Sequence, residues 1–111
     1  MHQPIVPLHV FFNKPPYPDA IFTANDLTAL AALQFAKEIG IKVPKKLCIV
    51  GYSNDLRTSI ALLSITTVNQ FRGRTGKVIV QELLKLLKGA QQTMIDLPII
   101  TPVELIRRMS T

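Results

Sequence analysis

Residues 18 to 35, PDAIFTANDLTALAALQF, constrain the fold more than any other stretch of the chain. A Pro-Asp turn signal precedes a short apolar run, residues 20 to 22, whose length is typical of a buried β-strand. The polar pair Asn25-Asp26 follows, and then an alanine- and leucine-rich segment that is typical of a helix. Ligands of open α/β sheets bind where the strands end. We therefore expect Asn25 and Asp26 to lie at the ligand-binding edge of a sheet.

The same alternation of strand and helix continues along the chain. Residues 47 to 51 are apolar, as in a strand covered on both faces, and residues 65 to 69 are rich in β-branched side chains. Residues 72 to 87 have apolar positions at helical spacing, and Gly89 is expected to end that helix. This order predicts βαβ units in a doubly wound α/β fold with a parallel sheet. The weaker patterns are a helix over residues 56 to 62 and strands over residues 93 to 100 and 103 to 106.

The N-terminal segment differs in composition from the rest. Residues 1 to 18 carry five of the eight prolines, which disfavour a helix because proline fixes φ and lacks an N–H donor. Residues 10 to 12, VFF, are interpreted as a short strand. His2 and His9 have no partners at metal-ligand spacing, so we assign them no chemical role. The chain is thus divided into a proline-rich irregular lead, residues 1 to 17, and a folded part, residues 18 to 111.

Composition limits the class of protein. The 111 residues are 48% hydrophobic, which suits one domain with a modest core. No apolar run reaches the ~20 residues of a membrane span, and no secretory signal is recognisable, so we expect a cytoplasmic protein without membrane contact. Cys48 lies in an apolar run and is interpreted as a buried, inert thiol. The net charge of +6 is dispersed, which favours a solvated basic surface over a nucleic-acid interface.

Catalytic signatures are missing from the sequence. It contains no GxSxG, HExxH, P-loop or GxGxxG motif. Asp26 and Asp55 each follow a predicted strand, and two carboxylates there can do acid–base chemistry. We prefer the alternative in which both cap helices or hold corners through hydrogen bonds. We therefore predict a protein that is not an enzyme, with no catalytic residue, no metal and no cofactor.

Four stretches together carry a family resemblance: PDAIFTANDLTALAAL, GIKVPKKLCIVGYSND, ITTVNQ and the closing VELIRRMST. In this order and spacing they resemble the effector-binding, periplasmic-binding-protein-like domain of the LacI (lactose repressor) family of bacterial transcription regulators. The resemblance covers residues 18 to 111. It implies that the chain is the C-terminal part of that domain, a truncated lobe. Operator DNA would be bound only through an N-terminal domain that this chain lacks.

The resemblance also implies an effector site. The asparagine of the ND pair, here Asn25, lies in the family's effector site, and its amide offers both a donor and an acceptor. The corner after GY commonly begins with an aspartate, whereas this chain has Ser53 followed by Asn54. Arg72 stands where the family often places an effector-facing side chain. With Asp26, these residues form the predicted site for a small-molecule effector, a sugar or related metabolite. The alternatives are a helix cap for Asn25 and an exposed cation for Arg72.

Dimerisation is the second property that the resemblance implies. The family dimerises through its C-terminal lobe. When residues 27 to 39 are wound as a helix, Leu27 and Leu30 fall on the side opposite the expected sheet. We therefore predict a homodimer with these two leucines in the contact. The resemblance further implies that the chain crosses between two lobes near ITTVNQ, so that the helix from Arg72 must find different packing here.

Two other functions stay open. The chain could be a stand-alone α/β interaction or dimerisation module that binds no ligand, or the C-terminal half of a transporter's solute-binding protein. The sequence upstream of this chain would discriminate between them. A helix-turn-helix there would support the regulator, and an export signal would support the transporter component.

Overall fold

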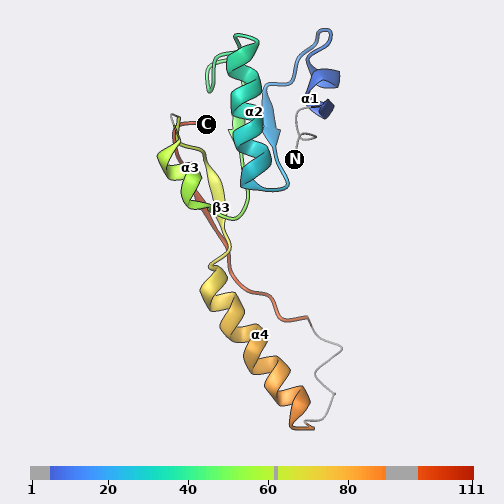
Figure 1. Cartoon of the computed structure of the whole chain (residues 1–111), viewed down its shortest axis with the longest axis vertical. Coiled ribbons are helices and arrows are strands. Elements are labelled where there is room, and N and C mark those ends of the chain that lie inside the picture. Colours follow the sequence, from blue (N-terminus) through green and yellow to red (C-terminus); the bar gives the residue numbers. More distant parts are fainter. Residues whose placement is uncertain (1–5, 62, 90–97) are drawn as a thin grey trace.

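The computed structural model describes residues 6–61, 63–89 and 98–111. The molecule is elongated, 57 × 27 × 23 Å. One end is a small α/β unit, and a long helix, α4 (Arg72–Leu87), projects away from it beyond strand β3 (Figure 1). None of the described helices combines the length and the apolar character that crossing a bilayer requires.

Parallel strands form the centre of the α/β unit. Strand β1 (Ala20–Phe22) pairs in parallel with β2 (Cys48–Val50), and Ile21 lies opposite Ile49. A parallel bridge from Val50 to Thr66 continues this pairing toward β3 (Thr67–Asn69). The predicted parallel α/β architecture is therefore confirmed.

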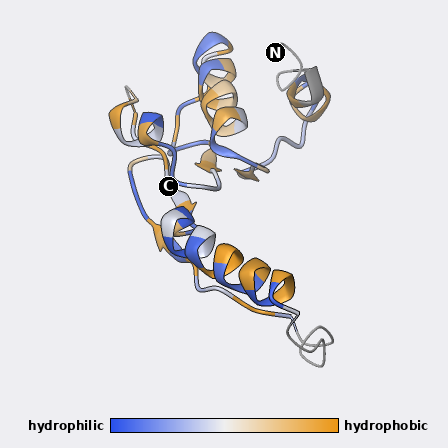
Figure 2. Cartoon of the chain, turned by 60° about the horizontal axis from the view of Figure 1, so that its bottom comes forward, coloured by the Kyte–Doolittle hydropathy of each residue, from blue (hydrophilic) through white to orange (hydrophobic). Residues whose placement is uncertain are grey.

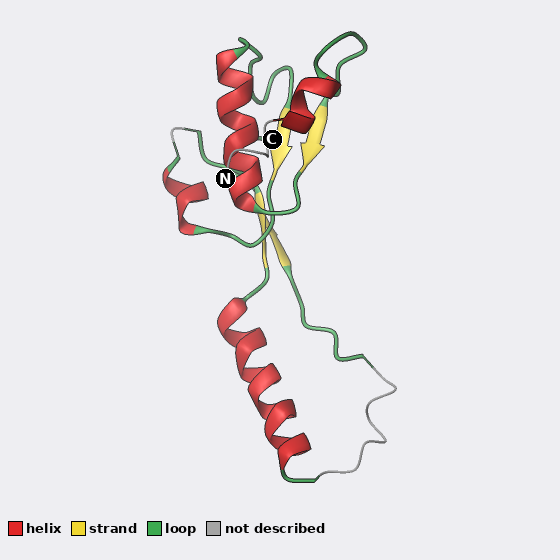
Figure 3. Cartoon of the chain, turned by 45° about the vertical axis from the view of Figure 1, so that its right-hand side comes forward, coloured by secondary structure: helices red, strands yellow, loops and turns green. Residues whose placement is uncertain are grey.

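Strand β3 also forms an antiparallel ribbon that the sequence did not predict as a pair. Its partner is β4 (Glu104–Ile106), with Thr67 opposite Ile106. The ribbon joins the α/β unit to α4 (Figure 3). Of the predicted strand over residues 93 to 100, residues 98 to 100 have no regular secondary structure, and residues 93 to 97 lie outside the described residues.

Helix α2 (Asp26–Glu38) begins and ends where the sequence predicts. Asn25 is its N-cap and accepts a hydrogen bond from the Thr28 N–H. Gly40 follows the helix with φ of +78°, a conformation that glycine adopts without steric cost. The N–H of Ile41 donates to the Ala36 carbonyl at 2.8 Å, which completes a Schellman C-cap.

The core lies between α2 and the sheet. Small side chains on the buried face of α2 let the helix approach the strands closely, and Phe35 fills the wider end. The remaining buried apolar positions come mainly from the strands and their flanks. The core residues are Leu8, Ala29, Ala32, Phe35, Ala36, Leu47, Ile49 and Ile65. Ile39, the C-cap of the helix, is exposed.

The predicted irregular lead contains a helix, so that part of the sequence interpretation is wrong. Helix α1 spans Val6–Phe11, and Leu8 is only 7% exposed in the core. Pro7 lies in the first turn, where a missing N–H leaves no helical hydrogen bond unmade. The predicted strand over residues 10 to 12 is also wrong, because His9 and Phe12 pack against Phe35 from one side of this turn.

The two remaining helices match their predicted positions. Helix α3 covers Leu56–Ile60. Helix α4 ends at Leu87, and Gly89 follows it with φ of +75°. No residue of α4 is buried. Apolar residues recur along it (Figure 2). Large apolar side chains of the helix, such as Ile79 and Leu87, are exposed. The expectation that this helix finds different packing is thus not met within the described chain.

Gly51 sets how closely α2 approaches the sheet. A Cβ at this position would overlap Asp26 Oδ1 and crowd the Ala29 side chain at 3.2 Å. We predict that Gly51→Ala lowers the free energy of unfolding by ~1–3 kcal/mol, because the helix must move away from the sheet. Gly76→Ala is the control, since a Cβ on that α4 residue meets nothing within 4 Å. Urea unfolding followed by circular dichroism measures both, and equal stability of Gly51→Ala and the parent would contradict the prediction.

Candidate functional site

The carboxyl ends of β1 and β2 lie at one edge of the sheet, beside the start of α2. The two strands point the same way, toward the β3/β4 ribbon (Figure 3). Asn25 comes shortly after β1, and Ser53 and Asn54 come shortly after β2. The structure therefore places the polar corners predicted from the sequence on neighbouring strands.

Asn25 caps α2 and keeps one functional group free. Its Oδ1 accepts from the Thr28 N–H at 2.9 Å and from the Thr28 hydroxyl at 3.0 Å. Within the described residues, its Nδ2 donates to no protein acceptor, and the side chain is exposed. The cap interpretation is confirmed, and an amide donor is left at the surface.

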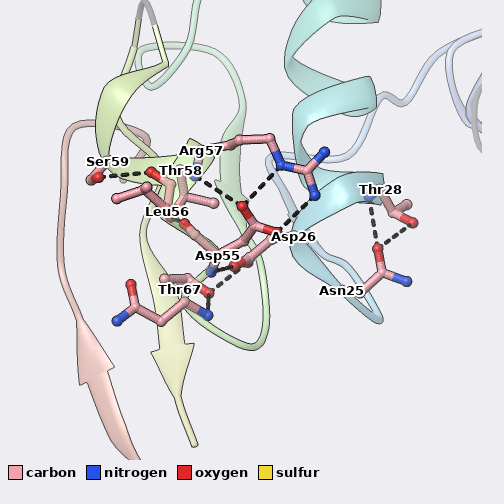
Figure 4. A network of polar contacts seen from close by, with 10 residues as sticks. Asn25, Asp26, Thr28, Asp55, Leu56, Arg57, Thr58, Ser59 and Thr67 are labelled. Carbon is pink, nitrogen blue, oxygen red and sulfur yellow. Dashed lines mark hydrogen bonds and ion pairs between the residues drawn. The ribbon is translucent and has the colours of Figure 1, made fainter. Parts of the chain in front are cut away.

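Asp26 lies beneath this edge of the sheet. It is only 1% exposed. Its Oδ1 accepts from the Thr67 hydroxyl and its Oδ2 from the Asp55 N–H, both at 2.6 Å (Figure 4). Both oxygens are therefore occupied by groups from β3 and from the residue before α3. Asp26 joins three elements and presents no free oxygen to solvent.

The corner after β2 has an unusual backbone. Ser53 and Asn54 have φ of 117° and 58°, in the left-handed region. Their N–H groups donate to the Val68 carbonyl at 2.9 Å and to Thr67 Oγ at 3.2 Å. The Ser53 hydroxyl has no protein partner in the described part of the chain, whereas Asn54 Oδ1 accepts from Arg108 Nη2 at 3.0 Å. Ser53 thus keeps its hydrogen-bonding group available, and Asn54 uses its amide oxygen.

The carboxylate of Asp55 is committed to Arg57. Asp55 Oδ1 accepts from the N–H and the Nε of Arg57, each at 2.9 Å, and Oδ2 lies 2.7 Å from Arg57 Nη2. The Arg57 side-chain hydrogen bond is the main reason that the pKa of Asp55 lies far below its usual range. In turn, Asp55 raises the pKa of Arg57. Asp26 and Asp55 have separate partners, so they do not form the acid–base pair considered from the sequence.

Arg72 begins α4 and is exposed, without an ion pair among the residues described. Its charge contributes slightly to lowering the pKa of Asp55, behind Arg57. The helix has no side-chain N-cap, since Phe71 occupies that position with φ of 50°. No hydrogen bond in the described chain joins Arg72 to Asn25 or Ser53. The structure therefore brings the two corners together but leaves Arg72 separate from them.

An aromatic pair at the same edge was missed from the sequence. Phe22 is the last residue of β1 and is 69% exposed, and its ring centroid lies 6.4 Å from that of Tyr52, which follows β2. A run of three apolar residues does not reveal which of them is uncovered. Arg108 was also missed, because its only signal was its place in a basic pair near the C-terminus.

Other features of the surface fit a ligand less well. A hollow of about 650 Å³ lies between α1 and α2, lined by residues such as Phe12 and Tyr17. It is away from the carboxyl ends of the parallel strands, where ligands of open α/β sheets bind, so we favour the edge as the site. Among the residues that the structure describes, no group of three or more His, Cys, Asp or Glu side chains is placed to hold a metal ion.

Comparisons with known proteins show the family of the chain. The model of the periplasmic binding protein-like domain matches residues 6–111, which includes most of the lead segment. The HTH-type transcriptional repressor PurR of Aliivibrio salmonicida is 37% identical over 71 residues, which are 64% of this chain and 21% of the repressor. The chain thus spans about a fifth of the length of this relative.

Two solved structures show the same fold. The periplasmic binding ribose operon repressor protein of Lactobacillus acidophilus has a TM-score of 0.84 and 31% identity, over 99% of this chain and 40% of that one. A lac repressor dimer bound to operator and the anti-inducer ONPF has a TM-score of 0.81 and 27% identity, over 97% and 37%. These relatives are transcription regulators, which suits a protein that is not an enzyme.

The Asp55–Arg57 pair gives a prediction on pH. Because the folded-state pKa of Asp55 is depressed, the pair stabilises the fold above the unfolded pKa near 3.8 and loses this effect as the pH falls below it. We expect Arg57→Gln to raise the pKa of Asp55 toward that ordinary value, as measured by carboxyl ¹³C NMR titration. Arg107→Gln is the matched control and should leave it depressed. An unchanged pKa in Arg57→Gln would assign the depression to another cause.

Proposed function

The chain belongs to the periplasmic-binding-protein-like domain family, in the branch of LacI-type transcription regulators, and from this we propose that it is the effector-sensing and dimerisation portion of such a regulator. One observation carries the proposal. The free amide donor of Asn25 and the free hydroxyl of Ser53 lie at the ends of two adjacent parallel strands. Ligands bind at that edge in open α/β sheets.

The residues divide into those that contact the effector and those that hold the site. Asn25 and Ser53 offer hydrogen bonds to a polar solute, and Phe22 offers an exposed ring beside them. Asp26 and Asn54 are engaged within the protein, so we assign them to holding the two corners in place. Arg72 stays in the proposal as a residue that approaches the effector only when the part beyond β3 closes over the edge.

A sugar or related metabolite is the effector class we propose. A polar ring needs a few fixed donors and acceptors beside an apolar surface. Asn25, Ser53 and Phe22 supply that combination without a free carboxylate at the corner. Solved relatives include a ribose operon repressor and a transcriptional regulator in complex with cellobiose. We apply that ligand class to this chain as part of the proposal.

Coupling to DNA would run through the β3/β4 ribbon. The ribbon joins the sheet edge to α4, so closure around an effector would move α4 relative to the α/β unit (Figure 1). Attached DNA-binding domains could then shift between two arrangements, which is coupling between distinct sites. In this proposal the regulator works in the cytoplasm, and an N-terminal domain outside this chain contacts the operator. A stand-alone interaction module and a transporter's solute-binding protein remain the competing functions.

The two roles of Asn25 can be separated in the intact regulator. Asn25→Asp keeps the oxygen that caps α2 but loses the Nδ2 donor, whereas Asn25→Ala loses both. We expect both variants to weaken effector binding by ~1–3 kcal/mol, because a ligand group is left without its hydrogen bond. Only Asn25→Ala should also lose ~1 kcal/mol of stability. Calorimetric titration with a panel of sugars and nucleosides, together with thermal melting, measures the two effects.

The experiment tests the two roles of Asn25, helix cap and effector contact, independently. Thr28→Val removes the hydroxyl that donates to Asn25 Oδ1 and is the control for disturbance of the cap without loss of Nδ2. If Asn25→Asp binds the identified effector as tightly as the parent, Asn25 is a helix cap only. If no compound in the panel binds the parent protein, the sugar-effector proposal itself is contradicted.

We also predict that the chain self-associates through α2. Leu27 is 36% exposed, and Leu30 lines an open hollow of about 490 Å³ with Leu33 and Leu63. We expect a dimer, because a two-fold contact would cover this apolar surface. Leu27→Lys and Leu30→Lys should shift the sedimentation coefficient toward that of the monomer. Leu56→Lys, on the exposed side of α3, should not.

The dimer prediction is tested at a defined protein concentration. A parent chain that stays monomeric at about a hundred micromolar would have a dimer dissociation constant too weak for this role. That result would contradict the dimer. Variants at Leu27 and Leu30 that remain fully dimeric would contradict only the proposed surface.

A further inference from the structure

The C-terminal segment brings a guanidinium against the corner that follows β2. Arg108 donates through Nη1 to the Thr58 hydroxyl at 2.9 Å and to the Ile65 carbonyl at 3.1 Å, and through Nη2 to Asn54 Oδ1 at 3.0 Å. These acceptors belong to α3, to the residue before the β2–β3 bridge, and to the corner itself. A rigid planar fork of donors can satisfy all three at once, which a lysine ammonium cannot do in the same geometry.

The corner requires such support from its surroundings. Ser53 and Asn54 adopt left-handed backbone conformations, which cost free energy for residues other than glycine unless neighbouring structure enforces them. Three successive amides, of residues 53 to 55, donate to β3 or to Asp26. These bonds hold the corner through its backbone, and Arg108 holds it through the Asn54 side chain.

The charge of Arg108 is not used in an ion pair. Over residues 6–61, 63–89 and 98–111, the three hydrogen bonds of its guanidinium all go to neutral oxygens, and no carboxylate lies within salt-bridge distance. Arg108 is half-buried, so part of its hydration is lost without a counter-ion. Its contribution is therefore geometric: it fixes where Asn54 lies relative to α3 and β3.

We propose that Arg108 is a positioning residue of the effector corner, acting through the Asn54 side chain, and that Asp26 is its counterpart, acting through the Asp55 N–H. Together they keep Ser53 at the sheet edge with its hydroxyl free. That this corner binds an effector rests on the function proposed above. The positioning itself does not, because the contacts form without a ligand, so the two ideas can fail separately.

Amide hydrogen exchange of the chain, followed by NMR, tests the positioning without any ligand. Arg108→Lys should lower the protection factors of the Ser53 and Asn54 amides ~tenfold, the effect of losing a hydrogen bond from a charged donor. The Thr23 and Cys48 amides, which donate between β1 and β2, should keep theirs. Arg107→Lys is the matched control, since Arg107 is the exposed neighbour in the same basic pair.

Asp26 is tested through a different amide. Asp26→Ala removes both acceptor oxygens, so the Asp55 N–H loses its partner and protection of the Asp55 amide should fall ~tenfold. Asp19→Ala, at an exposed position before β1, is its control and should change nothing at the corner. Loss of protection that is equal at the corner and at Thr23 and Cys48 would show a purely global role and overturn the proposal.

A variant that is expected to increase amide protection distinguishes the loss of this contact from general unfolding. Asn54→Asp keeps the oxygen acceptor and tolerates the left-handed backbone, and it places a carboxylate opposite Arg108. The Ser53 amide should become several-fold better protected, and this gain should vanish when Arg108→Gln is added. If Asn54→Asp has the same effect with and without Arg108, or if Arg108→Lys leaves the corner unchanged, Arg108 does not position it.

Discussion

The buried carboxylate of Asp26 is the interaction on which the rest of the α/β unit depends. It lies at the first turn of α2, where the helix dipole favours a negative charge, and its two oxygens accept from Thr67 and from the Asp55 N–H. A buried carboxylate is stable only when such donors satisfy it. Gly51 is required beside it, because any side chain there would occupy the space of its Oδ1. One side chain thereby fixes the distances among α2, β3 and the start of α3.

Helix α4 has no comparable anchor. Its ends are defined locally, by the left-handed Phe71 and Gly89, and the one ion pair of α4 among the described residues is the weak Lys85–Glu82 pair at 3.0 Å. Isolated helices of this length gain little stability from propensity alone. The apolar side chains along α4 therefore contribute little to the fold as described, in contrast to the alanine face of α2. The two parts of the molecule thus differ in how much apolar surface they bury, and the β3/β4 ribbon lies between them (Figure 3).

Local signals explain why much of this fold could be predicted from the sequence. The cap at Asn25, the span of α4 and the glycine that ends it depend on residues close in sequence, and all three are confirmed. Helix α1 was missed because the prolines of the lead segment disfavour a helix on average, although Pro7, the proline of the helix, occupies a position that tolerates it. The roles of Asp26 and Arg108 depend on partners far away in sequence; Asn54 and Arg108 are separated by 54 positions. No periodicity or propensity encodes such a contact.

The geometry of the corner connects stability with recognition. A left-handed residue other than glycine costs on the order of 1–3 kcal/mol, which the surrounding hydrogen bonds must offset. Those bonds come from β3 on one side and from Arg108 on the other, that is, from both strands of the ribbon or their extensions. A movement of the ribbon would alter the support of Ser53 and Asn54 directly. Conversely, a solute that binds Ser53 in its present place would favour the ribbon arrangement seen here, because binding can shift an equilibrium only toward the state it contacts best. The same hydrogen bonds that stabilise the corner thus give it a physical route to the rest of a regulator.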